Sequence, residues 1–332
     1  MRTVRFVAAL IAGTSLTASF WAASVAARAD DYPSRPITLL LPLGAGGAMD
    51  ILARAQFEPK LKERLGKPIV IENRTGGGTV IAATATAKAP PDGYTLFMAP
   101  AGTLTTNATL YKKLPYDPAK DFTPIALTSS VAFVLVVHPS LPVHSVKELI
   151  AYIKERPGQL AFGSTGIGAT PHLAFEIVMR EAGLKMTHVP YRGMPQAVND
   201  VVANHVQMVF ADPAGAPALI NDGKLRPLAV SSLQRIGVLP DVPTMNEAGL
   251  KGFEAVSWHM IVGPAGMPKE IVDRLNDEFK RISTSADFKV QVDRMGLIAI
   301  DSPPPAELRK FLDKEMASWG QLVKDVGIAG TE

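Results

Sequence analysis

The first half of the chain alternates short apolar runs with segments of helical periodicity. The predicted strands are Ile37–Leu43, Pro68–Glu72 and Tyr94–Ala99. Met49–Leu65 has the pattern of a helix, and the glycines at 76–78 open a second helix. Strands that alternate with helices in this way are typical of a parallel α/β sheet. We therefore expect a protein of the α/β class.

A second series of strands and helices starts near Val131. Its predicted strands are Val131–Val137, Leu160–Gly163, Met186–Pro190, Gln207–Phe210 and Leu225–Val230. One helix begins after Ser145, because Ser145 and Glu148 have the spacing of a capping box in which the glutamate reaches back. This helix is expected to bury Val146, Leu149, Ile150 and Ile153.

The last third supplies one more strand, Trp258–Val262, and two long helices, Pro268–Thr284 and Ala306–Leu322. The final helix places Leu308, Phe311, Leu312, Met316, Trp319 and Val323 on one apolar stripe. We expect this helix to pack back on the first domain. The predicted domains are residues 30–128 with 240–332, and residues 129–239. Two crossings between them are expected to form a hinge.

The N-terminal segment has the form of a secretory signal. Arg2 and Arg5 precede an uncharged apolar stretch, and Ala27 and Ala29 are small residues at the positions that a signal peptidase recognises. We expect a signal peptide of residues 1–29, cleaved after Ala29. The alternative is a permanent membrane anchor, which the Ser, Thr and Gly residues within the apolar stretch disfavour.

The composition of the chain without the signal peptide excludes some classes of function. The whole chain has 34 basic and 31 acidic residues, and the signal holds three of the basic ones, Arg2, Arg5 and Arg28. The rest of the chain therefore has no formal net charge, so its composition gives no support to nucleic-acid binding. The chain has no cysteine, which excludes disulfides, Cys nucleophiles and Cys-based metal sites.

Two segments, one in each predicted domain, join a strand to a helix through glycines. The first contains Leu43, Gly44, Gly46, Gly47 and Asp50, and the second contains Gly163, Ser164, Thr165, Gly166, Gly168, Thr170 and His172. Glycine lets the backbone approach a ligand, and a helix start offers unpaired N–H groups and a positive dipole end. Facing each other across a cleft, the segments are expected to bind a carboxylate or both ends of a dicarboxylate. Alternatively, each segment is only a tight connector.

Patterns for other chemistry are missing from the sequence. Neither glycine segment has the spacing of a nucleotide-binding loop or of a nucleophile elbow. The histidines are scattered, so we expect no metal site. Asp50 is interpreted as a carboxylate at a helix start or as the partner of a ligand amine. Tyr191 and Arg192 follow a strand and are candidates to line the cleft, although Arg192 is equally well explained as a solvated surface charge.

Further motifs extend from Tyr32 to the C-terminal helix. They are Ile71-Glu72-Asn73-Arg74, Pro91-Asp92-Gly93-Tyr94, Leu114-Pro115-Tyr116-Asp117-Pro118, His188-Val189-Pro190-Tyr191-Arg192-Gly193 and Leu239-Pro240-Asp241-Val242-Pro243. Together they resemble those of the substrate-binding proteins of tripartite tricarboxylate transporters, the Bug family. The resemblance implies a two-domain periplasmic Venus-flytrap fold with a ligand cleft between the lobes. It also implies that backbone amides and waters at two loops bind a carboxylate.

The same resemblance implies that further positions line the site, namely Ala101, Gly102, Ser130 in a turn, Tyr191, Ala211 and Asp212. The chain departs from the family pattern at three of the expected contact points. Leu43-Gly44-Ala45 replaces an aromatic residue and two prolines, Ala48 replaces a common hydroxyl residue, and Ala211-Asp212 replaces a common Asp-Asn. The ligands of other family members are therefore not transferred to this chain.

We expect a binding protein that closes around a small carboxylate and delivers it to membrane transporter subunits. Two alternatives stay open. The same cleft serves a sensor that feeds a membrane kinase, or it belongs to a periplasmic enzyme, which needs a nucleophile–base pair or a metal. No cofactor is expected. The sequence does not distinguish mono-carboxylates, dicarboxylates, aromatic acids and amino acids as ligands.

Overall fold

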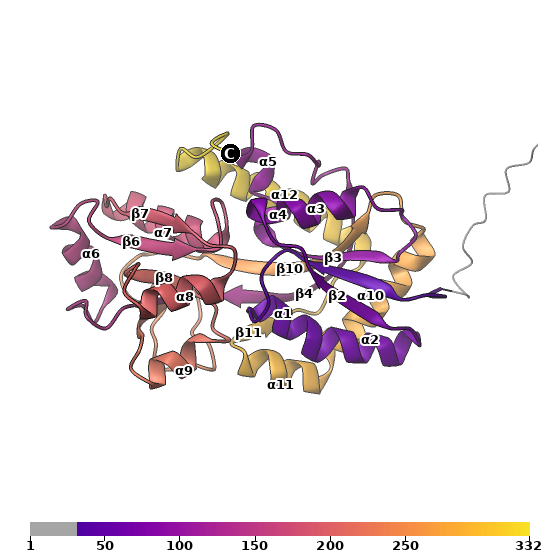
Figure 1. Cartoon of the computed structure of the whole chain (residues 1–332), viewed down its shortest axis with the longest axis horizontal. Helices are drawn as coiled ribbons and strands as arrows, with labels where there is room; N and C mark the ends of the chain where they lie inside the picture. The colour runs from indigo at the N-terminus through magenta and orange to yellow at the C-terminus, as the bar shows by residue number, and fades with distance from the viewer. Residues whose placement is uncertain (1–31) are drawn as a thin grey trace, which may run out of the picture.

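The computed structural model describes residues 32–332 and contains two mixed β-sheets (Figure 1). The first sheet has the order β11-β4-β10-β3-β1-β2 and the second has the order β7-β6-β8-β5-β9. The strands of the first sheet are β1 Ile37–Leu41, β2 Ile69–Asn73, β3 Thr95–Pro100, β4 Phe122–Ala132, β10 Val256–Pro264 and β11 Leu297–Ala299. Those of the second are β5 Val134–Val137, β6 Ala161–Ser164, β7 Thr187–Pro190, β8 Met208–Ala211 and β9 Arg226–Val230.

The helices lie around these sheets. They are α1 Ala48–Leu52, α2 Glu58–Leu65, α3 Val80–Ala87, α4 Ala101–Leu104, α5 Asn107–Leu110, α6 Val146–Lys154, α7 Thr170–Ala182, α8 Met194–Val202, α9 Ala216–Asn221, α10 Lys269–Thr284, α11 Ala286–Arg294 and α12 Pro305–Asp325. The predicted helix Met49–Leu65 is divided, because a π-helical turn at Ala53–Phe57 separates α1 from α2. Within residues 32–332, no helix is both long and apolar enough to cross a membrane.

Strand direction differs from the parallel arrangement that the alternation of elements predicts. β1 pairs in parallel with β2 and β3, and β6 pairs in parallel with β7 and β8. However, β10 is antiparallel to both β3 and β4, and β5 is antiparallel to both β8 and β9. β4 and β5 are joined by a single residue, and β9 is joined to β10 by a long segment that runs to the other sheet. β5 and β10, which enter a sheet after each crossing, run opposite to its βαβ units, whereas β4 and β9 run in the same sense as those units.

The predicted strand Val131–Val137 is wrong, because it combines parts of two strands. β4 ends at Ala132 in the first sheet and β5 begins at Val134 in the second, so the chain changes sheets at Phe133. Every residue from Val131 to Val137 is buried, and the apolar run therefore carries no mark of the change. The chain returns to the first sheet between Val230 and Val256. The predicted domain boundaries are close to these two crossings and stay a prediction.

The capping of α6 agrees with the sequence in part. The Ser145 side chain accepts a hydrogen bond from the Glu148 N–H at 3.1 Å, as expected. Glu148 reaches back one residue further than expected, since its carboxylate accepts from the His144 N–H at 2.7 Å. Ile150 is only partly buried, whereas Val146, Leu149 and Ile153 are fully buried.

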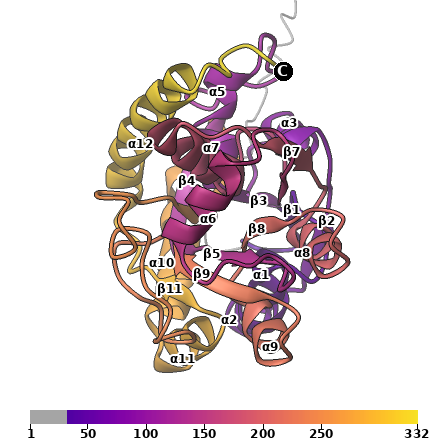
Figure 2. The same cartoon turned by 90° about the vertical axis from the view of Figure 1, so that its left-hand side faces the viewer.

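The C-terminal helix α12 follows the predicted stripe. Leu308 and Leu312 are fully buried in a cluster with Trp258 of β10. Further along the helix, Val323 packs with Leu110 of α5 and Leu173 of α7. Because α7 follows a strand of the second sheet, α12 contacts elements that belong to both halves of the molecule, and Figure 2 shows it running along one side.

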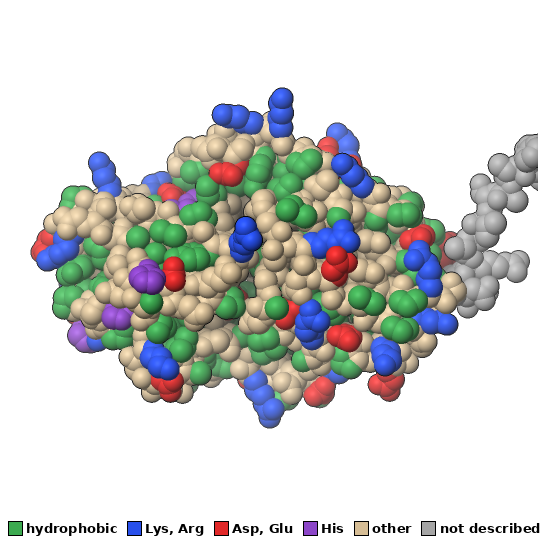
Figure 3. Space-filling model, viewed as in Figure 1, with side chains coloured by type: hydrophobic (Ala, Val, Ile, Leu, Met, Phe, Trp, Pro, Cys, Tyr) green, Lys and Arg blue, Asp and Glu red, His purple; other side chains and the backbone are tan. Residues whose placement is uncertain are grey.

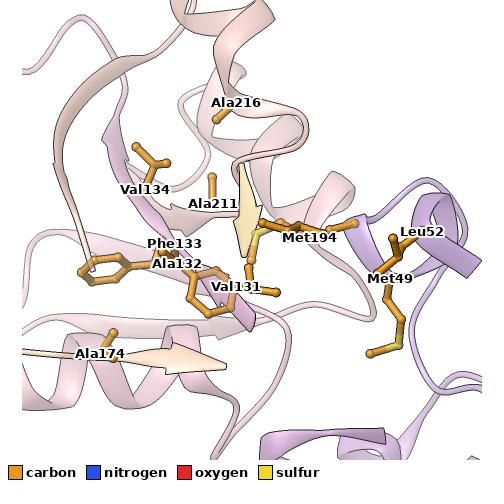
Figure 4. Close-up of a cluster of buried hydrophobic side chains, with 14 of the residues drawn as sticks. Met49, Leu52, Val131, Ala132, Phe133, Val134, Ala174, Met194, Ala211 and Ala216 are labelled. Carbon is orange, nitrogen blue, oxygen red and sulfur yellow. The ribbon is translucent and has the colours of Figure 1, made fainter. Parts of the chain in front are cut away.

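One hydrophobic cluster also continues across the junction of the sheets. Figure 4 shows Met194 of α8 between the crossing segment near Val131 and Met49 of α1. All three side chains are at most 5% exposed. The two halves are therefore packed against each other beside the segment where the chain changes sheets.

Candidate functional site

A cavity lies where the loop after β1 faces the loop after β6. Residues from both sheets and their connections line it, and about 70 Å³ of its interior is open to the centres of water-sized molecules. That is room for several waters or for a small organic acid. We call it the inner cavity. Nine predicted site residues line it: Leu43, Gly44, Gly47, Asp50, Gly102, Thr165, Gly168, Thr170 and Asp212.

The first loop is held by Asp50. Gly46, at φ +84°, donates its N–H to the Asp50 carboxylate at 3.1 Å. The same carboxylate accepts from Arg54 Nε at 2.9 Å and from Asn73 Nδ2 at 3.0 Å. Burial raises the pKa of Asp50, but these hydrogen bonds outweigh it and hold the pKa below its usual range. Asp50 thus fixes the loop conformation, and its charge is already compensated by Arg54.

The second loop is held by two side chains from outside the cavity. The Gly166 N–H donates to Ser164 Oγ at 3.1 Å, and the Gly168 N–H donates to His172 Nδ1 at 3.1 Å. Both glycines have positive φ, +125° and +74°, which favours glycine at these positions. His172 is buried at 3% exposure and its ring lies 4.1 Å from that of His188, which also contacts Ser164 Oγ at 2.6 Å. His172 therefore supports the loop from behind.

Between these anchored amides, other N–H groups lack a partner. The amides of Gly47, Thr165 and Ile167 belong to residues that line the inner cavity, and no acceptor within residues 32–332 hydrogen-bonds to them. Gly46, Gly166 and Gly168 use their N–H groups to hold the loops, which the sequence does not reveal. Residues with unpaired amides from two loops, one beside each sheet, therefore line the same space.

Several cavity residues escape the sequence prediction. Gly78 and Thr79 line the inner cavity, although the glycine run at 76–78 predicts only a helix entry. His259 of β10 lines it too, with Nδ1 3.1 Å from Ser129 Oγ. Burial lowers the pKa of His259 to about 4, so the ring is neutral near pH 7. Nothing in the apolar sequence around His259 distinguishes it from a core histidine.

The remaining predicted site residues lie at other places. Gly46 lines an adjoining cavity near α8 and α9 that Asp212 also borders. Gly166 and Tyr191 line an outer cavity, in which about 510 Å³ is open to the centres of water-sized molecules. Six residues, Ala101, Ser130, Gly163, Ser164, His172 and Ala211, line none of these three cavities. Ser130 is in β4 opposite Trp258 and not in a turn, so that part of the prediction is wrong.

The outer cavity adjoins the inner one. Leu43, Gly78, Thr79, Thr165 and Ile167 line both, so these residues separate the inner space from the outer. Arg192 and Glu332 line only the outer cavity and give it one charge of each sign. Because the two cavities share these residues, a ligand can reach the inner cavity through the outer one.

Charged groups are otherwise spread over the surface. Figure 3 shows basic and acidic side chains interspersed on one face, in keeping with their equal numbers after residue 29. The described residues contain no group of three or more His, Cys, Asp or Glu side chains placed to hold a metal ion.

Comparison with known proteins gives a consistent family. Residues 52–328 match the model of the tripartite tricarboxylate transporter family receptor, TctC. Three solved structures are similar. Rpa4515 of R. palustris with adipate is 36% identical, with a TM-score of 0.86 over 90% of this chain and 99% of that one. The periplasmic binding protein BugD is 32% identical, with a TM-score of 0.84 and the same coverage.

The third structure is MatC from Rhodopseudomonas palustris with bound malate. It is 30% identical, with a TM-score of 0.82 over 88% of this chain and all of that one. The similar structures confirm the predicted two-lobed α/β fold of periplasmic binding proteins. The resemblance carried by the sequence motifs is confirmed as well, and the chain belongs to the TctC, or Bug, family of solute-binding receptors.

Proposed function

We propose that this protein captures a small carboxylate in the inner cavity, without transforming it, and presents it to the membrane subunits of a tripartite tricarboxylate-type transporter. The observation that carries the proposal is that residues with unpaired amides from two loops line one cavity. Gly47 contributes from the loop after β1, and Thr165 and Ile167 contribute from the loop after β6. Such amides bind an anion without a cationic side chain.

The family supports the chemical class of the ligand. Two similar proteins hold dicarboxylates, adipate in Rpa4515 and malate in MatC. The size of the inner cavity, with about 70 Å³ open to the centres of water-sized molecules, is consistent with a small acid. The loops come from opposite sides of the crossing at Phe133, so a bound acid holds the two halves together and stabilises a closed form.

Family membership also supports the compartment and the partner. The family description names a receptor of a transporter, and BugD is a periplasmic binding protein. The proposed signal peptide, cleaved after Ala29, lies outside the described residues. Its removal releases the protein into the periplasm, where the closed form is the state that the transporter subunits recognise.

A pair of substitutions at Gly47 tests the capture of a carboxylate. Gly47 has φ −80°, which proline adopts without strain, and a Cβ at this position meets its nearest neighbours at 3.8 Å. Gly47→Pro deletes the unpaired N–H, whereas Gly47→Ala retains it. Calorimetric titration with adipate, malate and a panel of other small acids supplies the affinities.

We expect Gly47→Pro to lose at least ten-fold in affinity for any acid that binds, and Gly47→Ala to lose far less. Thermal unfolding of both variants checks that the fold is kept. NMR of the released acid is expected to show the same compound that was added. Equal affinity in both variants would show that the Gly47 amide does not bind the ligand, and conversion of the acid would indicate an enzyme.

A further inference from the structure

Asp212 brings a negative charge to the wall of the inner cavity. It follows β8 in the second sheet, and its carboxylate makes one hydrogen bond with the described residues, a long one of 3.5 Å from the Ala48 N–H. Ala48 begins α1 beside the first sheet, so this weak contact spans the junction between the two halves. Asp212 is thus both part of the cavity wall and poorly satisfied by its neighbours.

The other charged groups at the inner cavity do not compensate Asp212. Asp50 is itself a carboxylate and is already paired with Arg54 at 2.9 Å. His259 is neutral near pH 7, since burial lowers its pKa to about 4. No Lys or Arg of the described chain lines this cavity, and Arg192 lines only the outer one. Asp212 therefore lies in the wall of the inner cavity and of the adjoining one near α8 and α9, and no Lys or Arg is among the described residues that line either.

We propose that Asp212 selects ligands that carry a positively charged amino group together with a carboxylate. The inference rests on the proposed capture of a carboxylate and adds the second half of the ligand. The ligand carboxylate accepts from the unpaired amides of Gly47, Thr165 and Ile167, while its ammonium donates to Asp212. A charge-assisted hydrogen bond that is removed from water is among the stronger polar contacts in proteins.

The same carboxylate works against ligands that have no amine. An acid that is negative at both ends brings like charge into a small space beside an unpaired carboxylate, which disfavours it. The raised pKa of Asp212 is consistent with a buried carboxylate that has no cationic partner. Burial raises its pKa to about 6, and only the weak contact with Ala48 opposes this.

The experiment compares acids that differ only in the amine. Calorimetric titrations at pH 7.5 measure the affinities of L-aspartate against succinate, L-glutamate against glutarate, and γ-aminobutyrate against butyrate. In the pair that the unchanged protein binds most tightly, we expect the affinity for the amine-bearing acid to be at least ten-fold higher than that for the acid without the amine. In Asp212→Asn, which keeps the size of the side chain, we expect this preference to fall to about two-fold or less.

Asp241→Asn provides the matched control, because Asp241 is exposed and lies outside the three cavities. It is expected to keep the full preference. Tighter binding of the deaminated acids by the unchanged protein would overturn the role of Asp212 while leaving the capture of carboxylates intact. That role is equally overturned if Asp212→Asn keeps the preference. Binding of none of the six acids would contradict both proposals.

Discussion

Phe133 and Ser231 hold together the two places where the chain crosses between the sheets. The Ser231 N–H donates to the Phe133 carbonyl at 2.8 Å, and the Phe133 N–H donates to Ser231 Oγ at 2.8 Å. Ser231 Oγ in turn donates to the Ala255 carbonyl at 2.7 Å. The crossing from β4 to β5 is therefore tied to both ends of the segment that leads back from β9 to β10. A hinge motion of the two halves has to pivot about this cluster.

Ser231→Ala is expected to destabilise the protein by about 1–3 kcal/mol, because it leaves the buried N–H of Phe133 and the carbonyl of Ala255 without their side-chain partner. Urea unfolding measures the change. Ser232→Ala is the control, since among the described residues the Ser232 hydroxyl donates only to the carbonyl of Gln234, two residues away. An equal cost for both variants would show that the tie between the crossings contributes little.

The second loop depends on the ring of His172. Its replacement by Phe keeps an aromatic ring beside Phe162 and His188 but removes the acceptor of the Gly168 N–H and the contact of Nε2 with Glu176 at 3.2 Å. We expect a loss of about 1–3 kcal/mol in the free energy of unfolding. Amide hydrogen exchange at Gly168 is expected to accelerate, and acids are expected to bind more weakly. Unchanged exchange at Gly168 would contradict this role.

The sequence predicts the site better at the level of segments than of single groups. Glycines followed by a helix start predict the strand-turn-helix form of both loops, because backbone conformation at Gly46 and Gly166 is a local property. Which amide is left free depends on side-chain contacts that the glycine pattern does not specify. Asp50 takes the N–H of Gly46 and His172 takes that of Gly168, in each case from four residues further along the chain.

The change of sheets at Phe133 shows the same limit. Val131–Val137 is a continuous apolar run, and burial on both sides of Phe133 gives no turn residue to mark the crossing. The long stripe of the last helix, in contrast, is predicted well, because its period is a property of the sequence alone. The sequence does not reveal that Val323 reaches Leu173 beyond the first sheet.

The contact of α12 with α7 predicts a stability effect at a site remote from the cavities. Val323 is fully buried against Leu110 and Leu173, so Val323→Ala removes two methyl groups from a packed cluster. We expect a cost of about 2 kcal/mol in urea unfolding, from lost burial and the space left behind. Val290→Ala, at a side chain that is 49% exposed, is expected to change the stability by less than about 0.5 kcal/mol. Equal effects would contradict the packing of α12.

Asp212 and Asp50 are expected to affect stability with opposite dependence on pH. The pKa of Asp212 is raised from 3.8 to about 6, so the folded protein holds its proton more tightly than the unfolded chain does. The contribution of this group is fully present below pH 3.8 and is lost as the pH rises through 6. Asp212→Asn is therefore expected to match the unchanged protein at about pH 3.5 and to be more stable by up to about 3 kcal/mol at about pH 7.5.

Asp50→Asn reverses the trend. Because hydrogen bonds from Gly46, Asn73 and Arg54 hold the pKa of Asp50 below 3.8, its carboxylate stabilises the fold above that value and loses this effect as the pH falls through the lower, folded pKa. The variant is expected to be less stable at pH 7.5, with the deficit shrinking in acid. Urea unfolding of both variants from pH 3.5 to 7.5, each taken as a difference from the unchanged protein, cancels the other titrating groups. If both variants were less stable than the unchanged protein at pH 7.5, Asp212 would have a compensating partner in the ligand-free protein. The argument that it binds a ligand ammonium would then fail.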